Sequence, residues 1–147
     1  MSADAPWHFD QLRIADFYLV FFFRLGRARL SPKHRAIRNL AKSMGAERYE
    51  MQPDDQLIFS RMEKTQRAAM GALLSSNFFD SEQFLSGILV EGLSQETQPL
   101  SIRLDEANKA DSRLLGAIHS LVTEYDLLGA DGIKARTGLM EHRYDAT

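Results

Sequence analysis

The segment Phe17-Tyr18-Leu19-Val20-Phe21-Phe22-Phe23 places four phenylalanines and a tyrosine within seven consecutive residues of a 147-residue chain. Side chains this large and apolar have to be buried. The apolar residues of this region recur at steps of three and four: Leu12, Ala15, Leu19, Phe22 and Phe23. This spacing predicts a helix from about Phe9 to Leu25, with Gly26 near its end. A β-strand is the alternative, but the run lacks alternation.

A basic segment follows directly, with seven positive charges and no carboxylate between Asp16 and Glu47. Ser31-Pro32 is typical of a helix start, and Gly45 of a helix end, so a second helix is predicted from about Pro32 to Met44. A solvated helix face is one interpretation, although such faces usually mix charges of both signs. The other is contact with DNA backbone phosphates or an acidic protein. The residues predicted for that contact are Arg27, Arg29, Lys33, Arg35, Arg38 and Lys42.

The middle of the chain predicts a long helix and a small hairpin. Pro53-Asp54-Asp55 opens the helix, which runs to about Ser75. Asn77 tolerates the left-handed conformation that ends a helix. Two short apolar runs, Phe78-Phe79 and Ile88-Leu89-Val90, are predicted to pair as strands around the polar turn 80–83.

The last third of the chain predicts one more amphipathic helix. After a polar loop at 94–100, apolar spacing indicates a helix from about Leu104 to Leu128, ended by Gly129. A short helical turn is expected from Asp131, weakened by Gly132 and Gly138.

Three helices followed by a hairpin is the order of a winged helix-turn-helix. The predicted fold class is therefore mainly α (α+β), with a winged-helix-like core, a small β-hairpin and an added C-terminal helix. A single domain, 1–147, is expected, with its core at about 9–93 and a C-terminal helix and docking segment at 104–147. Orthogonal helical bundles share the first half of this pattern and stay an alternative.

The composition and the N-terminal sequence indicate where in the cell the protein is found. The net charge is only −2, and no cysteine is available for disulfides or thiolate metal sites. The N-terminus lacks the basic region of a signal peptide, and the apolar block is far shorter than the roughly 20 residues of a membrane span. A cytoplasmic protein without a membrane segment is predicted.

No motif for catalysis or metal binding stands out. The chain has four histidines, and no two are spaced to bind a metal from one helical face. Phosphate-binding glycine loops and serine elbows are missing. The carboxylate pairs at 54–55 and 105–106 suit helix N-termini, and Asp80 with Glu82 suits a solvated turn. We therefore expect no enzyme, no cofactor and no metal.

The charge of the third helix bears on DNA recognition. In a winged helix this helix would enter the major groove, yet the charges between Asp54 and Ser75 sum to zero. Sequence-specific base reading is therefore disfavoured, and a stand-alone winged-helix regulator that binds DNA is the second hypothesis. Non-specific DNA contact through the second helix is still possible on this charge, because contact with the DNA phosphate backbone needs only positive side chains that reach it.

Two segments are candidates for protein docking. The first helix is apolar on nearly all of its faces, and the core of a small domain covers only one face of a helix. Part of the apolar surface is therefore predicted to contact a partner or a second copy, through Phe17, Tyr18, Phe21 and Phe22. The alternative is a central core helix. Near the C-terminus, mixed charges surround apolar residues, which is typical of a docking segment with a polar rim. Its predicted residues are Lys134, Arg136, Leu139, Met140, Arg143 and Tyr144, and a segment packed on its own domain is the alternative.

These two ends of the chain resemble a known family. The sequences LRIADFYLVF at 12–21 and GIKARTGLMEHRYD at 132–145 are similar to the middle components of bacterial ABC-three-component conflict systems. The resemblance implies a small non-enzymatic subunit that couples an SMC- or RecN-like ABC ATPase to an effector, such as a nuclease, in defence against phages or plasmids. It also implies a proline where this chain has Phe22-Phe23, so the end of the first helix is left open.

Overall fold

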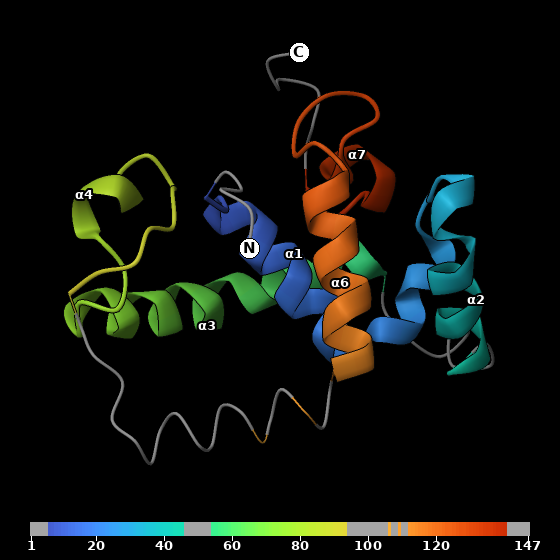
Figure 1. Cartoon of the computed structure of the whole chain (residues 1–147), viewed down its shortest axis with the longest axis horizontal. Coiled ribbons are helices and arrows are strands. Elements are labelled where there is room, and N and C mark those ends of the chain that lie inside the picture. The colour runs from blue at the N-terminus through green and yellow to red at the C-terminus, as the bar shows by residue number, and fades with distance from the viewer. Residues whose placement is uncertain (1–5, 46–53, 94–105, 107–108, 110–111, 141–147) are drawn as a thin grey trace. The chain divides into compact units, whose positions relative to one another are not determined.

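The computed structural model describes residues 6–45, 54–93, 106, 109 and 112–140. These residues are mainly helical, as predicted, and β-structure among them is limited to two isolated bridges. The helices, drawn in Figure 1, are α1 (Phe9–Val20), η1 (Phe22–Arg27), η2 (Pro32–His34), α2 (Arg35–Ser43), α3 (Asp55–Ser75), α4 (Ser81–Phe84), α6 (Ser112–Glu124) and α7 (Ile133–Thr137). Within the described part of the chain, no helix is long and apolar enough to cross a membrane.

The chain divides into two compact units. Unit 1 combines Met1–Arg13 with Glu63–Ser112, and unit 2 combines Ile14–Met62 with Arg113–Thr147. The chain passes from one unit to the other at three places, inside α1, inside α3 and directly after Ser112, the first residue of α6. The single-domain organisation stays a prediction.

The aromatic segment forms the core of unit 2. Helix α1 begins at Phe9 as predicted but ends at Val20, five residues before the predicted end at Leu25. Phe21 leaves the helix with φ −121° and ψ 52°, and η1 follows. Successive residues of an α-helix point about 100° apart, so a continuous helix would expose at least one of three adjacent rings. The break allows both Phe22 and Phe23 to be buried.

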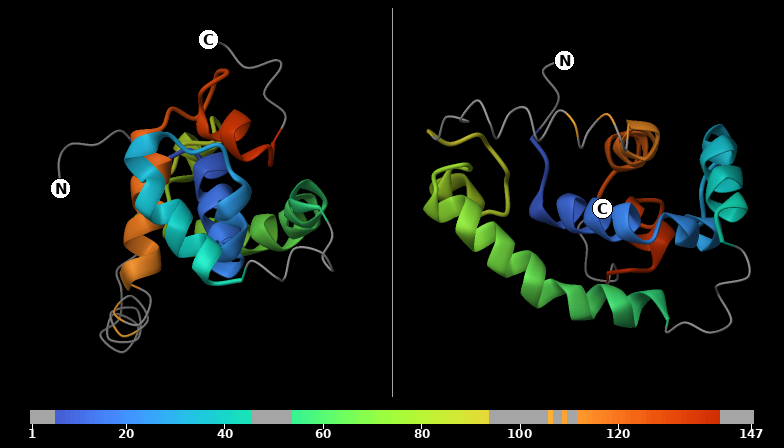
Figure 2. Two further views of the ribbon diagram at one scale, coloured as in Figure 1. Left: turned by 90° about the vertical axis from the view of Figure 1, so that its right-hand side faces the viewer. Right: turned by 90° about the horizontal axis from the view of Figure 1, so that it is seen from below.

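The second helix matches its prediction closely. Its first turn is the 3-10 helix η2, with Pro32 at the first helical position, and α2 ends at Ser43. Ser31 has the extended backbone of an N-cap, but its side chain makes no capping hydrogen bond. Helix α2 packs against η1, as Figure 2 shows.

In unit 1 the predicted hairpin does not form as two strands. Phe79 pairs with Glu91 in one isolated antiparallel bridge, while Ile88 forms a bridge to His8 instead. The predicted polar turn is the beginning of α4, because the Asp80 carboxylate accepts the backbone N–H groups of residues 82 and 83 at 2.8 and 3.3 Å. A side-chain cap of this kind stabilises a helical turn. The prediction that Asn77 ends α3 is confirmed by its φ of 60°.

The C-terminal part of unit 2 turns back after α6. Within the described residues this helix ends at Glu124, four residues before the predicted end at Leu128. The short helical turn predicted from Asp131 is α7, which begins after Gly132 and ends at Gly138 in the left-handed conformation, φ 69°. A Cβ atom on Gly132 would lie 2.3 Å from the Leu128 carbonyl oxygen, so this position requires glycine.

Candidate interaction surfaces

One charge of the basic segment lies in the interior. Arg24 is fully buried, and its guanidinium forms an ion pair with Asp55 at the start of α3. The rings of Phe21 and Phe23 have their centroids 5.7 and 5.5 Å from Arg24 Cζ. Aromatic faces and a carboxylate together compensate for the lost hydration of a buried guanidinium. Arg24 therefore belongs to the core of unit 2.

Arg29 and Arg136 bind each other's backbone. The Arg29 N–H donates to the Arg136 carbonyl at 2.9 Å, and Arg136 Nη1 donates to the Arg29 carbonyl at 2.8 Å. The Arg29 guanidinium also donates to the Ala130 carbonyl at 2.8 Å and pairs with Asp131 at 3.2 Å. The structure thus brings together one residue of the predicted basic surface and one of the predicted C-terminal docking segment.

Tyr125, directly after α6, holds the start of η2. Its hydroxyl accepts the Ser31 N–H at 2.7 Å and lies 2.8 Å from Nδ1 of the buried His34. The guanidinium of Arg136 lies over the Tyr125 ring at 4.4 Å, and Lys33 Nζ is 5.7 Å from its centroid. We call residues 29–34 together with 124–136 the clasp, because these contacts join segments that are distant in the sequence.

Glu124 adds charge to the clasp. Its carboxylate is 3.3 Å from His34 Nε2 and 3.6 Å from Lys33 Nζ. Loss of hydration raises the pKa of Glu124. The charges of His34 and Lys33, together with hydrogen bonds from His34 and Ser120, lower it by more, so the pKa of Glu124 lies below its ordinary value. The positive charge of Lys33 is therefore partly neutralised within the protein.

The remaining basic residues differ in accessibility. Arg38 is half-buried and donates to the Leu30 carbonyl at 3.0 Å, which ties its side chain to the loop before η2. Arg27, Arg35 and Lys42 are exposed. Within the part of the chain that the structure describes, Arg35 and Lys42 form no ion pair. Seven residues apart on α2, they share one face of the helix.

The aromatic docking candidates lie mostly inside unit 2. Phe17, Tyr18 and Phe22 are buried, and Phe21 is half-buried. The apolar side chains of this segment that stay exposed are Leu19 (38%) and Val20 (60%). The spacing of apolar residues did not predict that these two side chains are exposed while their neighbours are buried. Burial in this segment depends on where the helix breaks, and the break is set by tertiary packing. A docking role for the aromatic residues stays a prediction.

The C-terminal docking candidates divide in the same way. Lys134 and Leu139 are buried, and Arg136 and Met140 are half-buried. Arg143 and Tyr144 lie outside the described residues.

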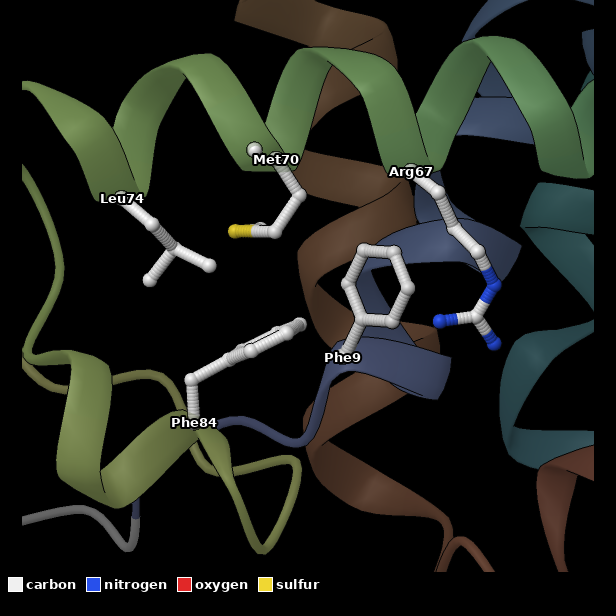
Figure 3. A pocket seen from close by; sticks show the side chains of 6 residues that line it. Phe9, Arg67, Met70, Leu74 and Phe84 are labelled. Carbon is white, nitrogen blue, oxygen red and sulfur yellow. The ribbon is translucent and has the colours of Figure 1, made fainter.

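Unit 1 holds an apolar pocket that the sequence analysis missed. Its lining comes from the start of α1, from α3 and from α4, namely Phe9, Arg67, Met70, Gly71, Leu74 and Phe84, and its volume is about 160 Å³. In Figure 3, Met70 and Leu74 point from α3 toward Phe84, while Phe9 and Arg67 lie beside each other at the other end. The spacing of 67, 70, 71 and 74 is helical, but Phe84 was expected after a turn and not on a helix. No sequence signal therefore linked it to α3.

A buried polar pair lies in the same unit. Arg13 Nε donates to the Gln66 side-chain oxygen at 2.7 Å, and Gln66 Nε2 donates back to the Arg13 carbonyl at 3.3 Å. Burial lowers the pKa of Arg13, and the nearby Glu63 and Asp10 carboxylates oppose that shift. Among the described residues, no group of three or more histidine and acidic side chains is arranged to hold a metal ion.

The sequence matches one family over nearly its whole length. The model of the ABC-three component (ABC-3C) system Middle Component 5 family covers residues 1–145. The chain belongs to this family. Comparison with curated proteins and with solved structures gives no match.

In this Middle Component 5 protein, most of the two segments that carried the family resemblance lies in unit 2. Residues 14–21 form the end of α1 and its break, and residues 132–140 form α7 with its two glycine ends. Both are largely structural, since Phe17 and Leu139 are buried and Arg136 closes the clasp. The family resemblance therefore rests largely on residues that stabilise the fold.

Proposed function

We propose that this Middle Component 5 protein is a non-enzymatic adaptor that couples an SMC- or RecN-like ABC ATPase to an effector in defence against phages or plasmids. The observation that carries the proposal is the family match over residues 1–145, because a middle component of a multi-component system requires partner subunits. Small winged-helix subunits of SMC-like complexes often bind protein, which agrees with the zero net charge of residues 54–75. The winged-helix arrangement itself stays a prediction.

Co-purification tests the adaptor. The three genes of the native operon are expressed together with a tag on the ATPase, and the complex is separated by size exclusion with light scattering. The middle component should elute with both other subunits in a fixed ratio. Omitting it should separate the effector from the ATPase. An ATPase–effector complex that forms equally well without the middle component would contradict the proposal.

We also propose that the exposed face of α2 contacts the DNA backbone in the assembled complex. Arg35 and Lys42 support this role, since they are exposed and the clasp does not neutralise them. Arg38 is a poorer choice for a test, because its side chain holds the Leu30 carbonyl.

The double variant Arg35→Glu/Lys42→Glu tests this face. Each lost phosphate contact reduces the slope of log affinity against log salt by about 0.9, so the slope for the complex should fall by nearly 2. The control is Arg61→Glu/Lys64→Glu, which makes the same charge change on exposed positions of α3. Equal salt slopes for wild type and the α2 variant would contradict the proposal that this face of α2 contacts DNA. Tight binding of the isolated protein to one operator sequence would instead favour a stand-alone regulator.

A further inference from the structure

The pocket in unit 1 has the size and lining of a site for one side chain. A cavity of about 150 Å³ lined by apolar residues accommodates a benzene ring, and this pocket has about 160 Å³. The rings of Phe9 and Phe84 meet edge to face, with centroids 5.4 Å apart and an angle of 73°. Met70 adds a flexible side chain that adapts to different shapes. Such a lining favours a leucine or phenylalanine side chain.

Arg67 gives the pocket one charged end. Its guanidinium carbon lies 5.3 Å from the centroid of the Phe9 ring, and its side chain is 56% exposed. Arg67 Nε donates to Glu63 at 2.7 Å. Among the described residues, its two Nη atoms make no hydrogen bond. This edge of a guanidinium suits a carboxylate, which it binds with two parallel hydrogen bonds.

Glu63 keeps Arg67 in this position without occupying that edge. The hydrogen bond from Arg67 lowers the pKa of Glu63, and the charge of Arg13 lowers it further. Glu63 therefore stays ionised, and it stabilises the orientation in which Arg67 lies along Phe9. An arriving carboxylate meets an arginine that is already placed, which reduces the entropy lost on binding.

We propose that this pocket receives one leucine or phenylalanine side chain from a segment of a partner subunit, and that an Asp or Glu beside that residue pairs with Arg67. This proposal rests on the proposed adaptor function, because it assigns the bound segment to another subunit of the same complex. A buried apolar anchor contributes affinity by filling its pocket, and a charge pair at the rim fixes the orientation of the bound segment.

Gly71 makes the pocket testable without disturbing the fold. It is exposed and lines the pocket, and a Cβ atom added to it would meet nothing within 4 Å. A leucine at this position adds a large side chain at the wall of the pocket without a collision, and we expect it to hinder entry of the ligand. Gly116 on α6 is the matched control, because it is also exposed and equally open.

The experiment uses the full chain and a displayed library of random peptides. Enriched peptides should carry leucine or phenylalanine with an acidic residue within three positions, and binding is then measured by fluorescence polarisation. Gly71→Leu should weaken binding at least tenfold, and Gly116→Leu should not change it. Arg67→Glu should weaken binding similarly, and replacing the acid of the peptide by lysine should restore it. Circular dichroism checks that each variant is folded.

Several outcomes would overturn the proposal. No enrichment, or binding that ignores both Gly71→Leu and Arg67→Glu, would show that the pocket takes no such segment. If wild type is a dimer that Gly71→Leu converts to a monomer, the occupant is a second copy and not a partner subunit. The adaptor function is judged separately by co-purification, since a complex that forms with Gly71→Leu at wild-type strength refutes the pocket alone.

Discussion

At the scale of single residues, the buried ion pair between Arg24 and Asp55 is the most sensitive feature of unit 2. A fully buried guanidinium loses its hydration, and the Asp55 carboxylate and the neighbouring ring faces help to compensate for that loss. Removing the carboxylate takes away the acidic partner of this buried charge.

We expect Asp55→Ala to lower the free energy of unfolding by about 3–5 kcal/mol, measured by urea denaturation. The control is Glu63→Ala, which removes an exposed i,i+4 pair with Arg67 and should cost less than about 1 kcal/mol. If the two variants lose similar stability, the Arg24 charge is compensated by something other than Asp55.

Gly132 is a second sensitive residue. Because a Cβ atom there would collide with the Leu128 carbonyl, Gly132→Ala should cost about 1–3 kcal/mol of unfolding free energy. The same substitution at Gly116, inside α6 and in open space, should be neutral or stabilise by up to about 1 kcal/mol. Thermal unfolding of both variants tests this contrast, and equal melting temperatures would refute it.

At the scale of elements, the clasp fixes the start of η2 against the end of α6 and the start of α7. Most of its hydrogen bonds are to backbone groups or to the Tyr125 hydroxyl, so they specify geometry more than charge. Glu124 is the part of the clasp that depends on pH. Its lowered pKa means that it stabilises the fold when ionised.

The stabilisation from Glu124 should be complete above the pKa of the unfolded chain, about 4.3, and should be lost as pH falls through the lower folded value. Glu124→Gln removes it. The stability difference between wild type and this variant should therefore shrink as the pH falls below about 4, measured by urea unfolding across pH. A difference that persists unchanged at pH 3 would show that charge is not its origin.

Local signals predicted the ends of several elements correctly. Asn77 adopts the left-handed conformation expected of a residue that ends a helix, and Pro32 begins η2. The end of α1 and the identity of α4 could not be predicted in this way. The end of α1 depends on how three adjacent aromatic rings are packed. The helical conformation of α4 depends on the Asp80 carboxylate cap, which competes with strand pairing.

At the scale of the whole molecule, neither unit is a continuous stretch of chain. Each combines two segments, and α1 and α3 each contribute to both units. We therefore expect a single unfolding transition, because unfolding one unit would interrupt two helices of the other. The fluorescence of Trp7, the one tryptophan of the chain, reports on unit 1, while far-UV circular dichroism reports on all helices. A dichroism curve with two steps, only one of them matched by Trp7, would contradict this expectation.

Residue periodicity, capping residues and short motifs are local in the chain, so they predict the helical class, several helix boundaries and the family. The accessibility of each charge and aromatic ring depends instead on tertiary packing. Arg29 meets a carbonyl 101 residues away, Arg24 meets an acid 31 residues away, and the pocket joins residues from three helices. Burial and pairing arise from contacts between distant segments, so no local pattern could separate Arg35 and Lys42 from their neutralised neighbours or reveal the site beside Arg67.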